Sequence, residues 1–195
     1  MKPDLLQLTL AMGDSDLILS QRLGAWCGHG PVLEEDLALA NVALDLLGQA
    51  RMWLSLHAER EGRNRTEDDL AFLRDAGAFR NLLLVEQPNG DYAFTMARQF
   101  YFDAWHKLAL EQLALSDDAS VAAIAAKAAK EVAYHLRRSR DWVVRLGDGT
   151  EESHRRMQTA IDALWPCTGE MFDEYFNDLR PAWQAEVEAT LQAAT

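Results

Sequence analysis

The feature that most constrains this 195-residue chain is the spacing of its apolar residues, which repeats every three or four positions over four long stretches. That spacing places apolar side chains on one face of an α-helix. We expect helices over residues 5–26, 34–61 and 92–115, and a fourth that is capped by residues 116–118 and ends near residue 146. Gly28–Pro31 and Gly147–Gly149 separate such stretches, because glycine and proline end helices. The sequence therefore predicts an all-α, antiparallel four-helix bundle.

The rest of the chain predicts a helical tail. A shorter helix over about residues 157–165 stops at Pro166, a weak one surrounds Met171, and a last one starts at Pro181. No internal repeat and no interdomain linker is visible. We therefore expect a single domain over residues 1–195, with a core bundle at about 5–147 and additional short C-terminal helices at 150–195. Residues 37–49 are apolar on almost every helical face and are expected at the centre of the bundle.

Composition narrows the class of partner. The net charge of −12 argues against nucleic acid, because phosphate binding needs a basic surface. A membrane-spanning helix at the start of the chain is not expected, since Asp14 and Asp16 interrupt the first apolar run. Cys27 and Cys167 lie far apart and form no metal-ligating spacing. These features predict a cytoplasmic protein that binds neither nucleic acid nor membrane.

Each of the four long helices has one carboxylate where its inward face should be apolar. These acids are Asp16, Asp45, Asp103 and Glu131. One inward acid per helix is the plan of the ferritin-like, carboxylate-bridged di-iron proteins. Those proteins also use an E-x-x-H step on two helices, because a histidine three positions after the acid lies beside it on the helix face. The sequence therefore has the frame of a ferritin-like bundle, and the histidine steps decide whether it has a metal site.

The E-x-x-H step is broken in both places where it is needed. In the second helix the quartet in register is Leu46–Gln49, which has neither the acid nor the imidazole. In the fourth helix Glu131 is followed at i+3 by Tyr134, and His135 comes one residue later, rotated by about 100° around the helix axis. We therefore expect no metal and no catalytic residue in this chain. The inward polar residues instead predict a vestigial hydrogen-bonded core network of Asp16, Asp45, Asp103, His106, Glu131 and His135.

Two alternatives remain open from the residues alone. Asp103 and His106 form an Asp-x-x-His step inside a core helix, so an atypical metal site around Asp103, His106, Glu131 and His135 would make the chain an autonomous metalloenzyme. A homodimeric helical adaptor is the other alternative.

The basic cluster of Arg137, Arg138 and Arg140 is either a solvated helix face or a contact for a partner or a phosphate, because the planar guanidinium group of arginine binds phosphate well.

Several blocks of the sequence resemble one family. The blocks are residues 36–41, 44–51, 81–90 and 103–106, and Lys130-Glu131 with Tyr134–Arg137. They are similar to the C subunits of bacterial phenylacetyl-CoA monooxygenases, the ring epoxidases of phenylacetate breakdown, and the likeness covers roughly Leu17 to Phe172. Together the blocks are specific, although each alone would be a weak signal.

The resemblance implies a ferritin-like, non-catalytic subunit in a larger assembly. Its partner would be a ferritin-like catalytic A subunit that holds the di-iron site. A small B-type subunit, and a reductase with flavin and an iron–sulfur centre, would complete an NADPH-dependent system. In that interpretation this chain holds no cofactor, and it pairs with and stabilises the catalytic subunit. A homodimer remains the alternative assembly.

Overall fold

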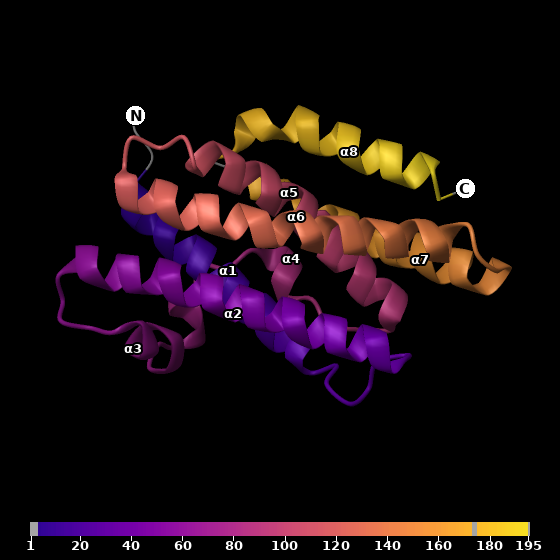
Figure 1. Cartoon of the computed structure of the whole chain (residues 1–195), viewed down its shortest axis with the longest axis horizontal. Helices are drawn as coiled ribbons and strands as arrows, with labels where there is room; N and C mark the ends of the chain where they lie inside the picture. The colour runs from indigo at the N-terminus through magenta and orange to yellow at the C-terminus, as the bar shows by residue number, and fades with distance from the viewer. Residues whose placement is uncertain (1–3, 173–174, 195) are drawn as a thin grey trace. The chain divides into compact units, whose positions relative to one another are not determined.

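The fold is all-α, as the sequence predicts. The computed structural model describes residues 4–172 and 175–194, and within these ranges there are eight α-helices, three short 3₁₀ helices and no strand (Figure 1). The chain divides into two compact units, residues 1–86 and residues 87–195, which are described one at a time. None of the helices in the described ranges is long and apolar enough to cross a membrane.

The first unit is built on two long helices. α1 (Leu5–Gly24) packs along α2 (Leu33–Glu61), and the short helices α3 (Glu67–Phe72) and α4 (Leu83–Glu86) complete the unit. Leu17, Leu54 and Leu70 belong to the apolar cluster that joins α1, α2 and α3. The two long helices approach closely at Gly13, where an added Cβ would lie 2.8 Å from the Leu54 side chain. A glycine is therefore needed at that crossing.

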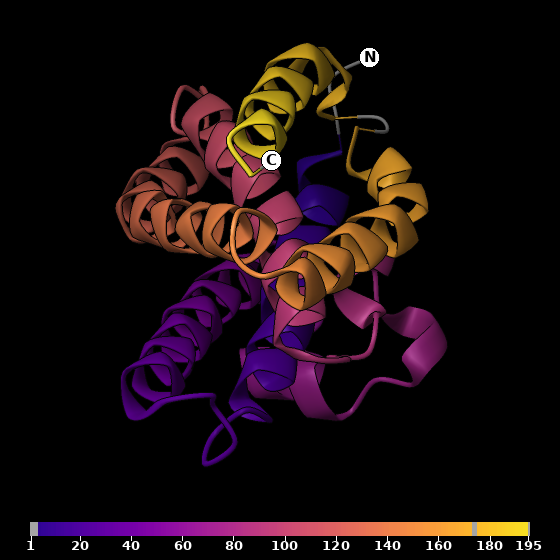
Figure 2. The ribbon, with the colours of Figure 1, turned by 90° about the vertical axis from the view of Figure 1, so that its right-hand side faces the viewer.

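The second unit is organised around α5. α5 (Tyr92–Leu113) contacts α6 (Ala119–Gly147), α7 (Glu151–Leu164) and α8 (Arg180–Gln192), and α6 also contacts α8 (Figure 2). The short 3₁₀ helices Trp165–Phe172 and Asn177–Leu179 lie between α7 and α8. Asp91 and Asp118 cap α5 and α6, because each side chain accepts hydrogen bonds from the first free backbone N–H groups.

An aromatic cluster holds α8 against α5. The indole Nε1 of Trp183 donates a hydrogen bond to the backbone oxygen of Tyr101 at 3.1 Å. The rings of Tyr101, Trp165 and Phe172 lie 5.2–5.7 Å from the Trp183 ring, centroid to centroid. Burial of these large rings supplies much of the apolar contact in this part of the unit. The predicted C-terminal helix is thus part of the packed core of its unit.

One expectation about α2 is wrong. Residues 37–49 were expected at the centre of a bundle, but Leu37, Leu44 and Leu47 are 56, 65 and 47% exposed. The buried face of α2 contains Leu39, Val42 and other residues, and α1 packs on this helix. A helix with apolar residues on several faces needs packing partners on each of them. In the described residues the face of α2 that carries Leu37, Leu44 and Leu47 has no such partner and is exposed to solvent.

Candidate functional site

The most polar part of the interior is centred on Asp103 of α5. This carboxylate is completely buried. The Gln99 amide donates to its Oδ1 at 2.7 Å, and the Ser139 hydroxyl of α6 donates to its Oδ2 at 2.8 Å. Gln99 lies one helical turn before Asp103, whereas Ser139 lies on the neighbouring helix. Two neutral donors therefore satisfy the two oxygens of one buried acid.

Two buried histidines, His106 and His135, lie in the same part of the interior, and His135 affects the pKa of Asp103. Burial raises the pKa of Asp103 to about 6, although His135, Ser139 and Gln99 act in the opposite direction. Burial and, to a lesser extent, the neighbouring His135 lower the pKa of His106 to about 3. The His106 ring also packs on Phe102, with 4.9 Å between ring centroids. His106 is therefore neutral at physiological pH.

This donor set does not fit a di-iron centre. Both oxygens of Asp103 already accept hydrogen bonds from neutral side chains. Among residues 4–172 and 175–194, no three His, Cys, Asp or Glu side chains come together in a way that could hold a metal ion. A buried hydrogen-bonded network is the chemistry that the cluster supports.

The six residues of the predicted core network fall in both units. Asp103, His106 and His135 come together in the second unit, where all three are buried. Glu131 lies on α6 of the same unit and is half-buried. Asp16 and Asp45 lie in the first unit, where Asp16 is completely buried and Asp45 is half-buried. A network that includes all six residues stays a prediction.

The first unit contains a buried ion pair that sequence reasoning missed. Asp14 is completely buried, and the guanidinium of Arg74 donates to both of its oxygens, at 2.9 Å from Nη1 and through Nη2. The backbone N–H of Arg80 donates to Asp14 at 2.8 Å. The available signal was a second aspartate in an apolar helix, two residues before Asp16. Helical spacing could not have identified Arg74, which is 60 residues away in the chain.

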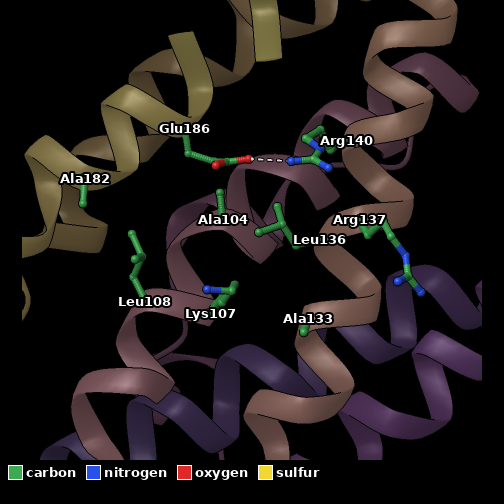
Figure 3. Close-up of a pocket in the computed structure, with 9 residues that line it drawn as sticks. All are labelled: Ala104, Lys107, Leu108, Ala133, Leu136, Arg137, Arg140, Ala182 and Glu186. Carbon is green, nitrogen blue, oxygen red and sulfur yellow. Dashed lines mark hydrogen bonds and ion pairs between the residues drawn. The ribbon is translucent and has the colours of Figure 1, made fainter. Parts of the chain in front are cut away.

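The predicted arginine cluster separates into inner and outer residues. Arg138 is only 9% exposed, and its guanidinium donates to the Tyr92 hydroxyl at 3.2 Å. Arg137 and Arg140 line a surface pocket of about 290 Å³, in which Arg140 faces Glu186 of α8 at 3.4 Å (Figure 3). Arg138 is thus part of the contact between α5 and α6. A partner or phosphate contact by the cluster stays a prediction, and it would fall to Arg137 and Arg140.

Comparison with known proteins matches the whole chain to one family model, described as "Phenylacetic acid catabolic protein", over residues 1–195. The chain belongs to this family. The all-α structure of the described residues is consistent with the ferritin-like fold of the phenylacetic acid catabolic proteins. One relative is the C subunit of the 1,2-phenylacetyl-CoA epoxidase of Escherichia coli strain K12. It is 54% identical over 201 residues, which cover 96% of this chain and 81% of the relative. The resemblance inferred from the sequence blocks is therefore confirmed.

Proposed function

We propose that this chain is the structural, non-catalytic subunit of a multicomponent phenylacetyl-CoA epoxidase that acts in cytoplasmic phenylacetate catabolism. The observation that carries the proposal is the 54% identity to the C subunit of such an epoxidase over 96% of this chain. At that level of identity over nearly the full chain, replacement of a subunit role by an unrelated one would be unusual. The chain pairs with a ferritin-like catalytic subunit and stabilises it.

In this proposal the cofactors lie in the partner subunits. The di-iron centre belongs to the catalytic subunit, and flavin and an iron–sulfur centre belong to the reductase, with a small B-type subunit also present. This division is supported by the described residues, among which no three His, Cys, Asp or Glu side chains are placed to hold a metal ion, and by the hydrogen bonds that Asp103 accepts from Gln99 and Ser139. The neutral state of the buried His106 is compatible with a packing role in the same cluster.

Reconstitution tests the subunit role directly. The other epoxidase subunits of the source organism are purified with and without this chain, and NADPH-dependent consumption of phenylacetyl-CoA is measured. We expect the catalytic subunit to be soluble and active only when this chain is present. Full activity without it would overturn the proposal. A stable homodimer of this chain that does not bind the catalytic subunit would favour the adaptor alternative.

Metal content of the chain expressed alone tests the non-catalytic role. Elemental analysis after growth with added iron is expected to give well under one iron per chain. The double variant Asp45→Asn with Glu131→Gln serves as the matched control, and we expect its iron content to equal that of the parent. One or two irons in the parent that are lost in the variant would favour the autonomous metalloenzyme instead.

A further inference from the structure

One face of α2 carries a continuous row of exposed apolar residues. Four leucines of the row are largely exposed: Leu33 (70%), Leu37 (56%), Leu44 (65%) and Leu47 (47%). Together with the half-buried Ala40, they are spaced four, three, four and three residues apart, and we call these five residues the leucine stripe. This alternation is the heptad pattern by which one helix packs along another. Single exposed leucines are ordinary on a protein surface, but a contiguous row of them marks an interaction site.

A groove extends the leucine stripe toward α3. Its volume is about 580 Å³, and its lining includes Leu44, Leu47 and Phe72. Phe72, at the end of α3, is 72% exposed, and the adjacent Leu73 is 77% exposed. Within this unit α3 lies against α2 (Figure 1). Because Leu44 and Leu47 belong to both the leucine stripe and the groove lining, the two form one surface. The surface offers both a seam along a helix and a recess for larger side chains.

The rim of this surface is mostly acidic. Glu34, Glu35 and Asp36 occupy the first turn of α2. Glu67 and Asp68, at the start of α3, line the groove. Arg51 of the groove lining is paired with Glu67 at 3.1 Å and offsets the charge of that one acid, so acids still outnumber cations on the rim. Complementary charges steer association and exclude wrong partners. The rim therefore selects a partner with lysines or arginines beside its apolar residues.

We propose that the leucine stripe is the docking surface for a helix of the catalytic subunit. That helix carries apolar residues at heptad spacing, with lysine or arginine along its flanks. The inference rests on the proposed function, which supplies the partner, and adds the surface by which the partner binds. It also accounts for the composition of α2, whose residues 37–49 are apolar on faces that the described chain does not cover.

The test uses the full chain and the purified catalytic subunit. The variant Leu37→Glu with Leu44→Glu is compared with the parent chain by isothermal titration. Two leucines that are buried at an interface both lose their apolar contacts on substitution by glutamate, so the dissociation constant should rise by at least about 100-fold. Leu115→Glu is the matched control, because Leu115 is 85% exposed and lies in the other unit. All of these side chains are exposed, so circular dichroism and the melting temperature should stay unchanged.

Two further measurements test the chemistry of the occupant and the exposure of the surface. Glu34→Lys is expected to weaken binding by about 3–10-fold at low salt, and this effect should shrink as salt screens the charges. Leu44→Cys, in a chain that carries Cys27→Ser and Cys167→Ser, should react quickly with a thiol reagent. The catalytic subunit should protect it. Slow labelling in the free monomeric chain would mean that the chain covers its own leucine stripe, which would overturn the inference.

The outcomes separate the inference from the proposed function. If the parent chain does not bind the catalytic subunit at all, the proposed function fails. If the parent binds and the double leucine variant binds within about threefold of it, the leucine stripe is not the docking surface and the function stands. If the parent chain is a homodimer and the double leucine variant is a monomer, a second copy of the chain occupies the leucine stripe and the inference is wrong.

Discussion

Asp14 in the first unit and Asp103 in the second are both completely buried, yet their surroundings satisfy them differently. Asp14 has a cationic partner, because Arg74 donates to both of its oxygens. Asp103 has two neutral partners, Gln99 and Ser139, and its pKa is raised to about 6. Neutral donors leave the protonation of Asp103 open to the surrounding pH, because they do not offset the cost of burying its charge. We therefore expect stability to depend strongly on the Arg74 partner of Asp14, and to depend on pH through Asp103.

Removal of the cation should have the largest effect. Arg74→Met leaves Asp14 buried without its charged partner, and we expect the free energy of unfolding to fall by about 3–5 kcal/mol in urea denaturation. Arg51→Met is the control, because the Arg51–Glu67 pair is 76% and 28% exposed and should be worth less than about 1 kcal/mol. If Arg74→Met fails to fold, Asp14→Leu with Arg74→Met should restore folding. Equal losses for Arg74 and Arg51 would contradict the comparison.

His106 should make the protein less stable in acid. Its pKa is about 3 when folded and about 6.5 when unfolded, so between these values only the unfolded chain binds the proton. Stability contributed by the neutral ring is therefore present above pH 6.5 and declines toward pH 3. In His106→Gln, urea denaturation should show about 3 kcal/mol less loss between pH 7 and pH 4 than the parent shows. His29→Gln, at an exposed turn, should follow the parent.

Asp103 should act in the opposite direction over part of the same range. Its folded pKa of about 6 lies above the ordinary value of 3.8, so the folded chain keeps the proton longer than the unfolded chain. Its contribution is full below about pH 4 and is lost as the pH rises through about 6. Relative to the parent, Asp103→Asn should gain about 2–3 kcal/mol between pH 4 and pH 7. The control is the exposed Asp141→Asn. A pH profile parallel to that of the parent would show that Asp103 does not titrate in this range.

The smallest expected effect compares matching helix caps in the two units. Thr66 and Thr150 each form a capping box, and each hydroxyl accepts a hydrogen bond at 3.2 Å from the backbone N–H three residues later. Thr66→Ala and Thr150→Ala should each cost about 1 kcal/mol in thermal or urea unfolding, and Thr→Ser at either site should cost less. If the two units unfold in separate transitions, each substitution should shift only the transition of its own unit.

The helices of this chain could be predicted because their signals are local. Apolar spacing placed the first long helix at residues 5–26 and the third at 92–115, and the structure has them at Leu5–Gly24 and Tyr92–Leu113. The capping box of Thr66 and Asp69 is a signal of the same kind, since it lies within four consecutive residues at the start of α3. Residues 81–86 are too short a run for apolar spacing to distinguish a helix from a strand, and part of the run forms α4.

Long-range partners were harder to predict. The sequence marked Asp103 and His106 as one face of α5, but Ser139 as a donor depends on the packing of α6. Arg138 could not be distinguished from Arg137 and Arg140 before the structure placed it beside Tyr92. The exposure of Leu44 was also missed, because apolar periodicity shows that a face will be covered and not which chain covers it.

The Asp14–Arg74 pair has a consequence for how the chain folds during synthesis. Ribosomes release α1 and α2 before they release Arg74, so a nascent chain that ends at residue 62 contains both long helices of the first unit and an acid whose cation has not yet been made. Burial of that lone charge is unfavourable. We therefore expect the hairpin of α1 and α2 to stay loosely packed until residues 74–80 emerge and fold back onto Asp14. We expect the first unit to reach its packed form only when this pair is complete.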